Sequence, residues 1–341
     1  MSLESIETST VQGTPEAVLP LAHSWLADGC GVALATVVET WGTAPRPAGA
    51  MLAVNEDGRF EGSVSGGCIE GAVIKEAQEV IKEGTPKSLT FGVSDEQAWE
   101  VGLTCGGEIT VWIRKLPSAQ YIDDITASIP TALIFNLVTG EEWDLHQPAG
   151  LPTEVAIAAQ EALNDDKSRK LVDTPYFVQA LNRPLRMIVV GAVHITQTLA
   201  PMAQMAGFQV TVIDPRKAYA TPERFPGVAL STDWPDDAMK ALNPDERTAV
   251  VLLCHDSKID DQGLAVALNS NAYYIGALGS RRTQEKRRAR MLEQGFSEQD
   301  LKRICGPVGL DLGGRSHAEI AVSILSEAIA VRHGKNLRND A

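Results

Sequence analysis

The chain has 341 residues, of which 44% are hydrophobic and 22% charged, and its formal net charge is −14 at pH 7. This length corresponds to about two globular domains, and the acidic balance argues against binding to nucleic acid or to an anionic membrane surface. The first residues are acidic and lack the apolar core of a secretory signal. The five cysteines show no disulfide framework and no C-x-x-C pair of a structural zinc site, so we expect reduced thiols in a cytoplasmic protein.

Residues 1–117 predict a mixed α+β module. Apolar residues recur at helical spacing over 15–28 and 68–82, and each of these stretches stops at a glycine. Expected strands cover 32–39, 50–54, 60–64, 88–93 and 108–113, with a hairpin turn at Glu56-Asp57-Gly58. The proline-rich stretch over 41–47 is expected to be an extended loop.

Residues 118–183 form a middle segment and linker. Strands are expected over 132–138 and 177–181, a helix over 154–164, and a polar surface turn over 164–170. The main boundary is placed just before Asn182-Arg183-Pro184.

From residue 184 to 334, apolar strands alternate with helical stretches, and 335–341 is a tail. The expected strands cover 187–191, 210–214, 249–254 and 273–278. Strands that are apolar throughout and separated by helices are typical of a parallel, doubly wound sheet. The fold class is therefore α/β, an N-terminal α+β module followed by a Rossmann-like domain. The apolar stretch near residue 190 is too interrupted to span a membrane.

Gly191 ends the first of these strands and resembles the first glycine of a dinucleotide-binding turn. Asp214 then ends the next strand, where an acid would bind a ribose hydroxyl. However, Val193 and Thr196 stand at the second and third glycine positions, and a β-branched residue hinders close approach of a pyrophosphate. His194, at the start of the next helix, could either meet a ligand or pack locally.

A second candidate anion site follows the strand over 273–278. Gly279 leads to Ser280, a good N-cap, and then to Arg281 and Arg282. Free N–H groups at a helix N-terminus bind anions, so we expect a phosphate or a partner here. The remaining basic residues of this helix are interpreted as a solvated face; they are Lys286, Arg287, Arg288 and Arg290.

Two cysteines in the N-terminal module are each flanked by glycine pairs. Cys68 follows Gly66 and Gly67 where a helix begins, and Cys105 precedes Gly106 and Gly107. Glycines allow close approach of a bulky ligand, and the positive end of a helix favours the nucleophilic, metal-binding thiolate. The alternative is a pair of buried, inert thiols in packed turns.

The loop over 41–51 carries two further candidates. Arg46 lies between two prolines that restrict the backbone, which suits a guanidinium that binds phosphate or carboxylate. Trp41 offers a flat face for a heterocycle or, alternatively, ordinary core packing.

These motifs resemble the xanthine dehydrogenase accessory family, XdhC/CoxI. In the first half the resemblance rests on Trp-Gly-Thr-Ala-Pro-Arg-Pro-Ala-Gly over 41–49, Gly-Ser-Val-Ser-Gly-Gly-Cys over 62–68 and Gly-Leu-Thr-Cys-Gly-Gly over 102–107. In the second half it rests on the segments 212–216, 274–283 and 306–311. Together the motifs cover nearly the whole chain in the same order as in the family.

The resemblance implies a molybdenum-cofactor chaperone rather than an enzyme with its own turnover. Such a protein binds molybdopterin cofactor transiently, supports its sulfuration by a cysteine desulfurase, and helps insert it into a xanthine dehydrogenase-type molybdoenzyme. Cys68 and Cys105 would contact the molybdenum or a transferable sulfur, because thiolates suit a soft metal. Arg46 would hold the pterin or its phosphate.

Two other functions remain open at this point. One is an NAD(P)-dependent oxidoreductase that uses Gly191, Asp214 and the neighbouring loops. The other is a docking protein that recruits partners through residues 281–290. A homodimer is expected because two-fold dimers are the commonest soluble oligomers.

Overall fold

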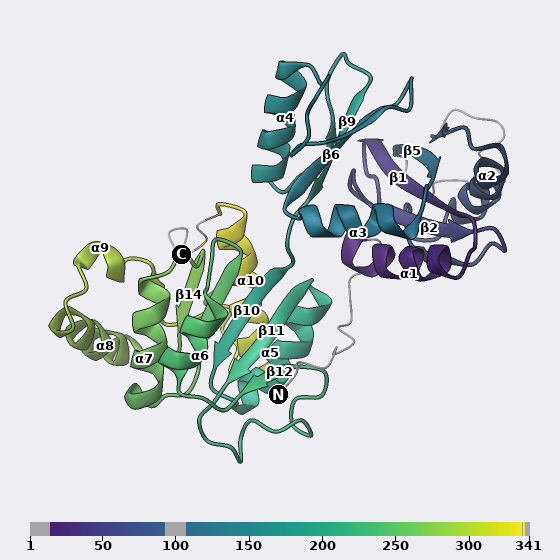
Figure 1. Cartoon of the computed structure of the whole chain (residues 1–341). Coiled ribbons are helices and arrows are strands. Elements are labelled where there is room, and N and C mark those ends of the chain that lie inside the picture. Colours follow the sequence, from purple (N-terminus) through teal and green to yellow (C-terminus); the bar gives the residue numbers. More distant parts are fainter. Residues whose placement is uncertain (1–13, 93–106, 336, 338–341) are drawn as a thin grey trace. The chain divides into compact units, whose positions relative to one another are not determined.

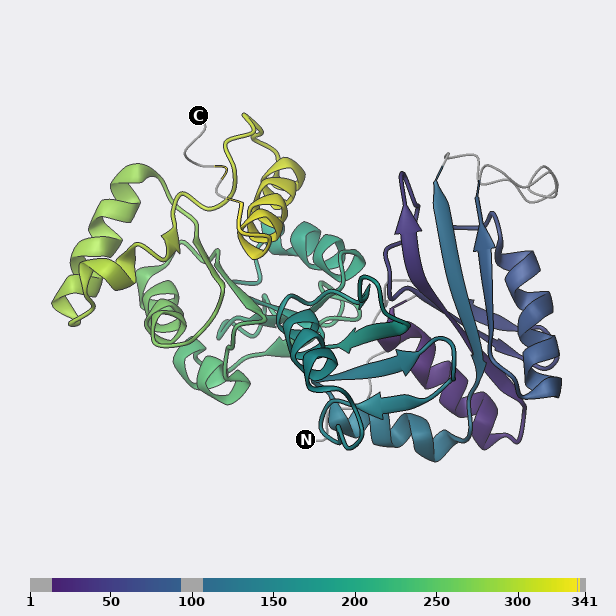
Figure 2. The same ribbon diagram turned by 90° about the horizontal axis from the view of Figure 1, so that it is seen from above.

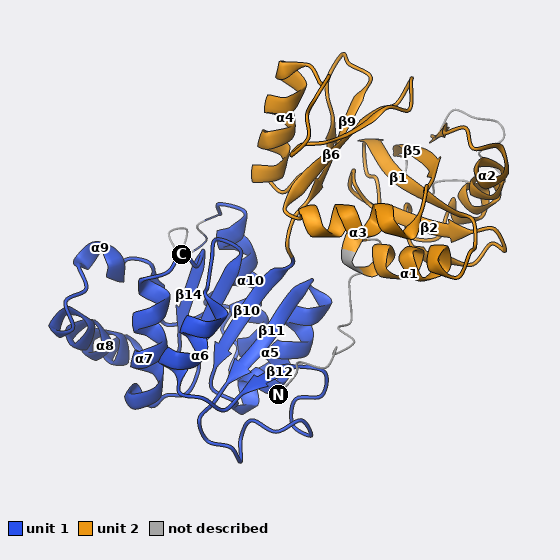
Figure 3. Cartoon of the chain, viewed as in Figure 1, with its two compact units in different colours: residues 1–10, 184–341 blue, residues 11–183 orange. Residues whose placement is uncertain are grey.

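The computed structural model describes residues 14–92, 107–335 and 337 (Figure 1). The chain divides between Arg183 and Pro184 into two compact units, and each has its own hydrophobic cores (Figure 3). Within the described residues, no helix is both long enough and apolar enough to cross a membrane.

The N-terminal unit is built on an antiparallel sheet with the strand order β3-β2-β1-β5-β4. Its strands are β1 (Val32–Trp41), β2 (Met51–Asn55), β3 (Phe60–Gly62), β4 (Lys87–Phe91) and β5 (Glu108–Lys115). The seven residues of β1 from Val32 to Val38 are buried, and its last three are exposed. The exposed end of β1 therefore leads directly into the proline-rich loop.

Helices cover both faces of this sheet (Figure 2). Helix α2 (Glu70–Glu83) buries Val73, Ala77, Val80 and Ile81 against one face and ends at Gly84 in the left-handed conformation. Helices α1 (Pro15–Ala27) and α3 (Ala119–Ser128) pack on the other face. The expected helices over 15–28 and 68–82 are thus confirmed to within two residues.

The middle segment adds a second antiparallel sheet, with the order β7-β6-β9-β8, and helix α4 (Thr153–Asn164). Its strands are β6 (Thr131–Asn136), β7 (Glu142–Asp144), β8 (Arg169–Lys170) and β9 (Tyr176–Leu181). Phe135 and Phe177 share one core with Leu34 of the first sheet, so residues 118–183 pack as part of the N-terminal unit. The expected polar turn over 164–170 is wrong at its end, because Arg169 and Lys170 pair with β9.

The C-terminal unit is an α/β fold with a six-stranded, entirely parallel sheet in the order β12-β11-β10-β13-β14-β15. Its strands are β10 (Leu185–Val190), β11 (Phe208–Ile213), β12 (Ala229–Ser231), β13 (Thr248–Leu252), β14 (Tyr274–Ala277) and β15 (Ile304–Cys305). This is the strand order of a Rossmann fold, whose order reverses between β10 and β13. The expected doubly wound parallel sheet is confirmed.

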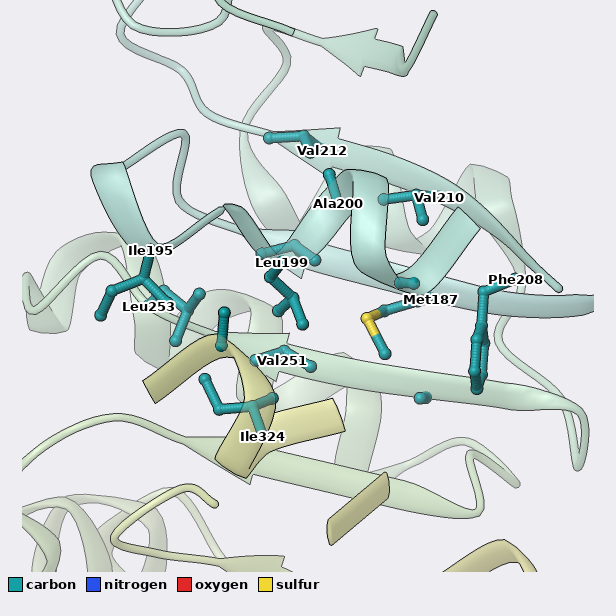
Figure 4. Close-up of a cluster of buried hydrophobic side chains, with 14 of the residues drawn as sticks. Met187, Ile195, Leu199, Ala200, Phe208, Val210, Val212, Val251, Leu253 and Ile324 are labelled. Carbon is teal, nitrogen blue, oxygen red and sulfur yellow. The ribbon is translucent and has the colours of Figure 1, made fainter. Parts of the chain in front are cut away.

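Helices also cover both faces of the parallel sheet. Helices α5 (His194–Met205) and α10 (His317–Arg332) pack on one face, where Leu199 and Ile324 meet Met187 and Val251 (Figure 4). The other face is covered by α6 (Pro235–Leu242), α7 (Ser257–Leu268), α8 (Arg281–Glu293) and α9 (Glu298–Leu301). Both cores consist almost entirely of aliphatic side chains.

The turn after β10 requires a glycine. Gly191 has a φ of +116°, and a Cβ at this position would lie 2.9 Å from the backbone N of Cys254. Its N–H donates to the carbonyl of Ile213 at 2.8 Å. The turn therefore lies tightly between the ends of β11 and β13.

We expect Gly191→Ala to destabilise the C-terminal unit by about 2–4 kcal/mol, since it adds both backbone strain and a clash with backbone atoms. Gly227→Ala is the matched control, because Gly227 also has a positive φ, of +69°, but faces open space. Urea unfolding followed by circular dichroism measures the difference. Equal stability of the two variants would contradict the close approach at Gly191.

Candidate functional site

The segments that carry the sequence motifs of the N-terminal unit meet at one end of the five-stranded sheet. The register pairs Trp41 with Glu108 and Leu52 with Gly62, and Phe91 pairs with Ile109. The end of β1, the end of β3 and the start of β5 therefore lie at the same edge. Antiparallel topology brings together three motifs that are far apart in the sequence.

Trp41 and Arg46 belong to the first of these motifs. The Trp41 side chain is 74% exposed, so the core-packing alternative for this residue is wrong. Arg46 is partly exposed, and no carboxylate among the described residues forms an ion pair with it. Both side chains remain available for a ligand.

The base of this loop is fixed by the second sheet. The carbonyl of Gly49 accepts a hydrogen bond from the amide of Gln179 in β9 at 3.2 Å, and that amide also donates to Ser168. The N–H of Gly49 donates to Val37 in β1 at 2.7 Å. The middle segment thus supports the loop that carries Arg46.

Of the third motif, the structure describes only Gly107. A Cβ on Gly107 would lie 2.9 Å from the carbonyl O of Trp41 and 3.0 Å from the backbone of Thr43, so this glycine permits contact with the first motif. Cys105 and Gly106 lie outside the described residues, and their assignment stays a prediction.

The second motif surrounds a buried carboxylate, that of Glu70. Its two oxygens accept hydrogen bonds from the hydroxyls of Ser63 and Ser65 at 2.8 and 2.6 Å. They also accept bonds from backbone N–H groups; the donors are Val64, Ser65, Gly66 and Gly67, at 3.2, 2.9, 3.1 and 2.9 Å. Glu70 is only 7% exposed. The loop after β3 is therefore wrapped around this one side chain.

Cys68 lies on the outer side of the same loop. Its thiol is free and exposed, so the alternative of a buried, inert thiol is wrong for Cys68. Gly66 and Gly67, with φ of +83° and +120°, turn the chain outward just before it. Helix α2 begins at Glu70, two residues after the cysteine, rather than at Cys68.

The environment of Glu70 keeps it ionised. Burial by itself raises the pKa of a carboxyl group, but the hydrogen bonds from Ser65 and Ser63 outweigh this effect and lower the pKa of Glu70 to about 2. Sequence reasoning missed this residue. An acid in the first turn of a helix is usually interpreted as an ordinary partner of the helix dipole, and its contacts depend on how the preceding loop folds back.

The described residues contain no group of three or more His, Cys, Asp and Glu side chains arranged to hold a metal ion. Cys68 would therefore act as a single soft donor toward a metal-bearing ligand and not as part of a resident metal centre formed by its described neighbours.

In the C-terminal unit, Asp214 is completely buried. One oxygen accepts bonds from the N–H and Nε of Arg216 at 3.0 and 2.9 Å, and the other from Arg216 Nη2 and the N–H of Ala192 at 2.7 and 2.8 Å. Burial would raise the pKa of Asp214, but the bonds from Arg216 and Ala192 hold it below its ordinary value. With both oxygens engaged, this carboxylate does not face a ribose, and we leave Asp214 out of the proposed site.

The neighbouring Cys254 is also unsuited to chemistry. Burial and the charge of Asp214 raise the pKa of the Cys254 thiol to about 12. Val193 is the N-cap of α5 and provides no side-chain cap. Together with the state of Asp214, these features give no support to a dinucleotide site at the Gly191 turn.

His194 is exposed at the start of α5, and its Nδ1 lies 3.1 Å from the side-chain oxygen of Gln197. Its ring lies 5.4 Å from that of His317, the first residue of α10. Two histidines thus meet at neighbouring helix starts, which the sequence alone did not indicate.

The loop after β14 places Gly279, Ser280 and Arg281 at the carboxyl edge of the parallel sheet. Ser280 is the N-cap of α8 and accepts the N–H of Thr283, and Arg281 is exposed. The solvated-face interpretation is wrong for Arg287, which is 3% exposed and lies 3.5 Å from Asp260. Arg290 pairs with Asp261 at 2.5 Å. These acids come from α7, so part of the basic run holds two helices together.

Comparison with known proteins agrees with the two-part design. Residues 25–92 match the model of the XdhC and CoxI family, and residues 187–328 match that of the XdhC Rossmann domain. The molybdenum cofactor insertion chaperone PaoD of Escherichia coli (strain K12) is 31% identical over 316 residues, which cover 92% of this chain and 88% of that protein. The chain belongs to the XdhC and CoxI family. The resemblance expected from the motifs is thereby confirmed.

Two further proteins resemble this XdhC and CoxI family member over most of their length. A probable xanthine dehydrogenase component of Bacillus subtilis (strain 168) is 26% identical, with 88% of this chain and 92% of that protein covered. A solved structure described as a xanthine dehydrogenase from Bacillus halodurans has a TM-score of 0.73 at 23% identity, and covers 94% and 96% of the two chains. This last likeness shows a shared fold.

The low pKa of Glu70 predicts a specific dependence of stability on pH in this XdhC and CoxI family member. Because the folded pKa of about 2 lies below the ordinary 4.5, ionised Glu70 stabilises the fold above pH 4.5, and this stabilisation is lost as the pH falls toward 2. The shift corresponds to roughly 3 kcal/mol. Unfolding free energies of the unaltered protein and of Glu70→Gln should differ by a constant amount near neutral pH and converge in acid. A difference that does not change with pH would contradict the assignment.

Proposed function

We propose that this chain is a molybdenum-cofactor chaperone, which binds molybdopterin cofactor, supports its sulfuration and delivers it to a xanthine dehydrogenase-type enzyme. The observation that carries the proposal is the exposed Cys68 thiol at the sheet edge where three motifs meet. The name of the relative PaoD, a molybdenum cofactor insertion chaperone, supports the same cargo.

The residues at this edge match the chemistry of that cargo, which combines a soft metal centre, a flat pterin and a phosphate. The Cys68 thiolate would approach the molybdenum or a sulfur to be transferred. The exposed face of Trp41 would lie against the pterin ring, and the guanidinium of Arg46 would bind the phosphate. Cys105 would be a second sulfur donor.

The proposal extends to partners. We propose a cysteine desulfurase as the source of sulfur, and the cytoplasmic location and the homodimer remain predictions. A dinucleotide-dependent oxidoreductase has no supporting observation, because Asp214 is already bound by Arg216 and Ala192.

The function is tested on the purified chain loaded with molybdopterin. Cys68→Ala and Cys105→Ala should each lose most of the bound cofactor, because each removes a soft ligand at the proposed site. Cys30→Ala is the control, since Cys30 is another free cysteine of the same unit. The measurement is the molar ratio of pterin and molybdenum to protein. Full retention in both variants would refute the role of the thiols.

Arg46 gives a separate test of the phosphate contact. A charge-assisted hydrogen bond contributes about 1.5–3 kcal/mol, so Arg46→Ala should weaken cofactor binding by roughly 10- to 100-fold. Arg59→Ala is the matched control, because Arg59 is exposed in the β2–β3 turn at the opposite end of the sheet. Titration of the apoprotein with molybdopterin measures both. Equal affinity of the two variants would place the phosphate elsewhere.

A further inference from the structure

The loop from Ser63 to Ile69 has no backbone N–H group left for a ligand. The N–H groups of Val64, Ser65 and Gly67 donate to Glu70, and that of Gly66 donates to both Ser63 Oγ and Glu70. The remaining donors of the loop bind neighbouring oxygens; they are Ser63 N to Met51 O at 3.0 Å, and Cys68 N and Ile69 N to Ser65 Oγ at 3.1 Å each. Every donor of the segment is therefore in use.

Such a loop cannot bind an external anion in the usual way. A glycine-rich loop before a helix commonly binds phosphate through its N–H groups, which form an anion-binding concavity. Here that concavity holds the protein's own carboxylate, buried and ionised. A phosphate would have to displace Glu70 from all of its hydrogen bonds, so the loop is unsuited to the phosphate end of a ligand.

The same contacts link Glu70 to the position of the thiol. Ser65 Oγ donates to Glu70 at 2.6 Å and accepts the N–H of Cys68 at 3.1 Å. Glu70 therefore reaches the backbone of Cys68 through one hydroxyl group. No direct bond between Glu70 and the thiol is needed to fix where the thiol points.

We propose that Glu70 is a positioning residue, which holds the loop so that Cys68 meets the soft, sulfur- and metal-bearing end of the ligand while phosphate is excluded from the loop. The identity of the ligand rests on the proposed function. The positioning of the loop by Glu70 does not, and it can be tested without any cofactor.

The first experiment measures amide hydrogen exchange over residues 63–69 in the full chain. Glu70→Gln places amide hydrogens against N–H donors, and Ser65→Ala removes the link to Cys68, so the loop amides should exchange at least ~10-fold faster in both variants. The amides of the buried half of α2 should keep their exchange rates. Glu79→Gln, which alters an exposed ion pair on the same helix, is the matched control and should change nothing in the loop.

Added anions distinguish a carboxylate-filled loop from a phosphate-binding loop. Acetate should restore slow exchange in Glu70→Ala, because it can supply the missing carboxylate, and should have no effect on Glu70→Gln. Inorganic phosphate should leave loop exchange in the unaltered protein unchanged. Protection of the unaltered loop by phosphate would overturn the exclusion of phosphate, and unchanged loop exchange in Glu70→Gln and Ser65→Ala would overturn the positioning role.

A final arm measures cofactor retention. Glu70→Gln and Ser65→Ala should retain as little molybdopterin as Cys68→Ala, although alkylation shows that Cys68 is still present and accessible. Full retention in variants whose loop exchange has accelerated would overturn the link between loop position and ligand. If the unaltered protein binds no molybdopterin, the proposed function fails, and the exchange experiments still decide the role of Glu70.

Discussion

The contact between Glu70 and the loop that precedes it determines the form of the whole site. A single carboxylate accepts bonds from two serine hydroxyls and from four consecutive backbone N–H groups. A buried charge is tolerated only when it is fully hydrogen-bonded, and buried N–H groups need acceptors. The loop and the acid therefore require each other. The exposed glycines and Cys68 project to solvent because the polar groups behind them are satisfied internally.

The C-terminal unit uses a similar arrangement at its own glycine turn. Asp214 accepts the N–H of Ala192, the residue after Gly191, and Arg216 balances its charge. In both units an acid of the chain occupies the position in which a helix start would otherwise bind an external anion. The parallel sheet thus keeps the Rossmann topology, while the residues at its turn are arranged for internal stability instead of for a pyrophosphate.

Sequence patterns predicted the elements better than the contacts between them. The helical spacing over 68–82 and the apolar strands from 187 onward predicted the elements almost as the structure has them, because local periodicity reflects which face is buried. The motifs around Cys68 and Arg46 were also found in the sequence. Their convergence depends on strand register, and the burial of Arg287 depends on Asp260 of a different helix, which local patterns do not encode. Glu70 was missed for the same reason.

The support of Gly49 by Gln179 bears on how this protein can be divided. The first sheet alone would lose the amide that fixes the loop after β1, and Leu34 and Trp112 would lose their aromatic neighbours Phe135 and Phe177. A fragment that ends near Pro117 would therefore expose apolar surface and release the Arg46 loop. The smallest transplantable part that keeps this edge intact extends to Arg183. The middle segment thus sets the minimum size of the functional module.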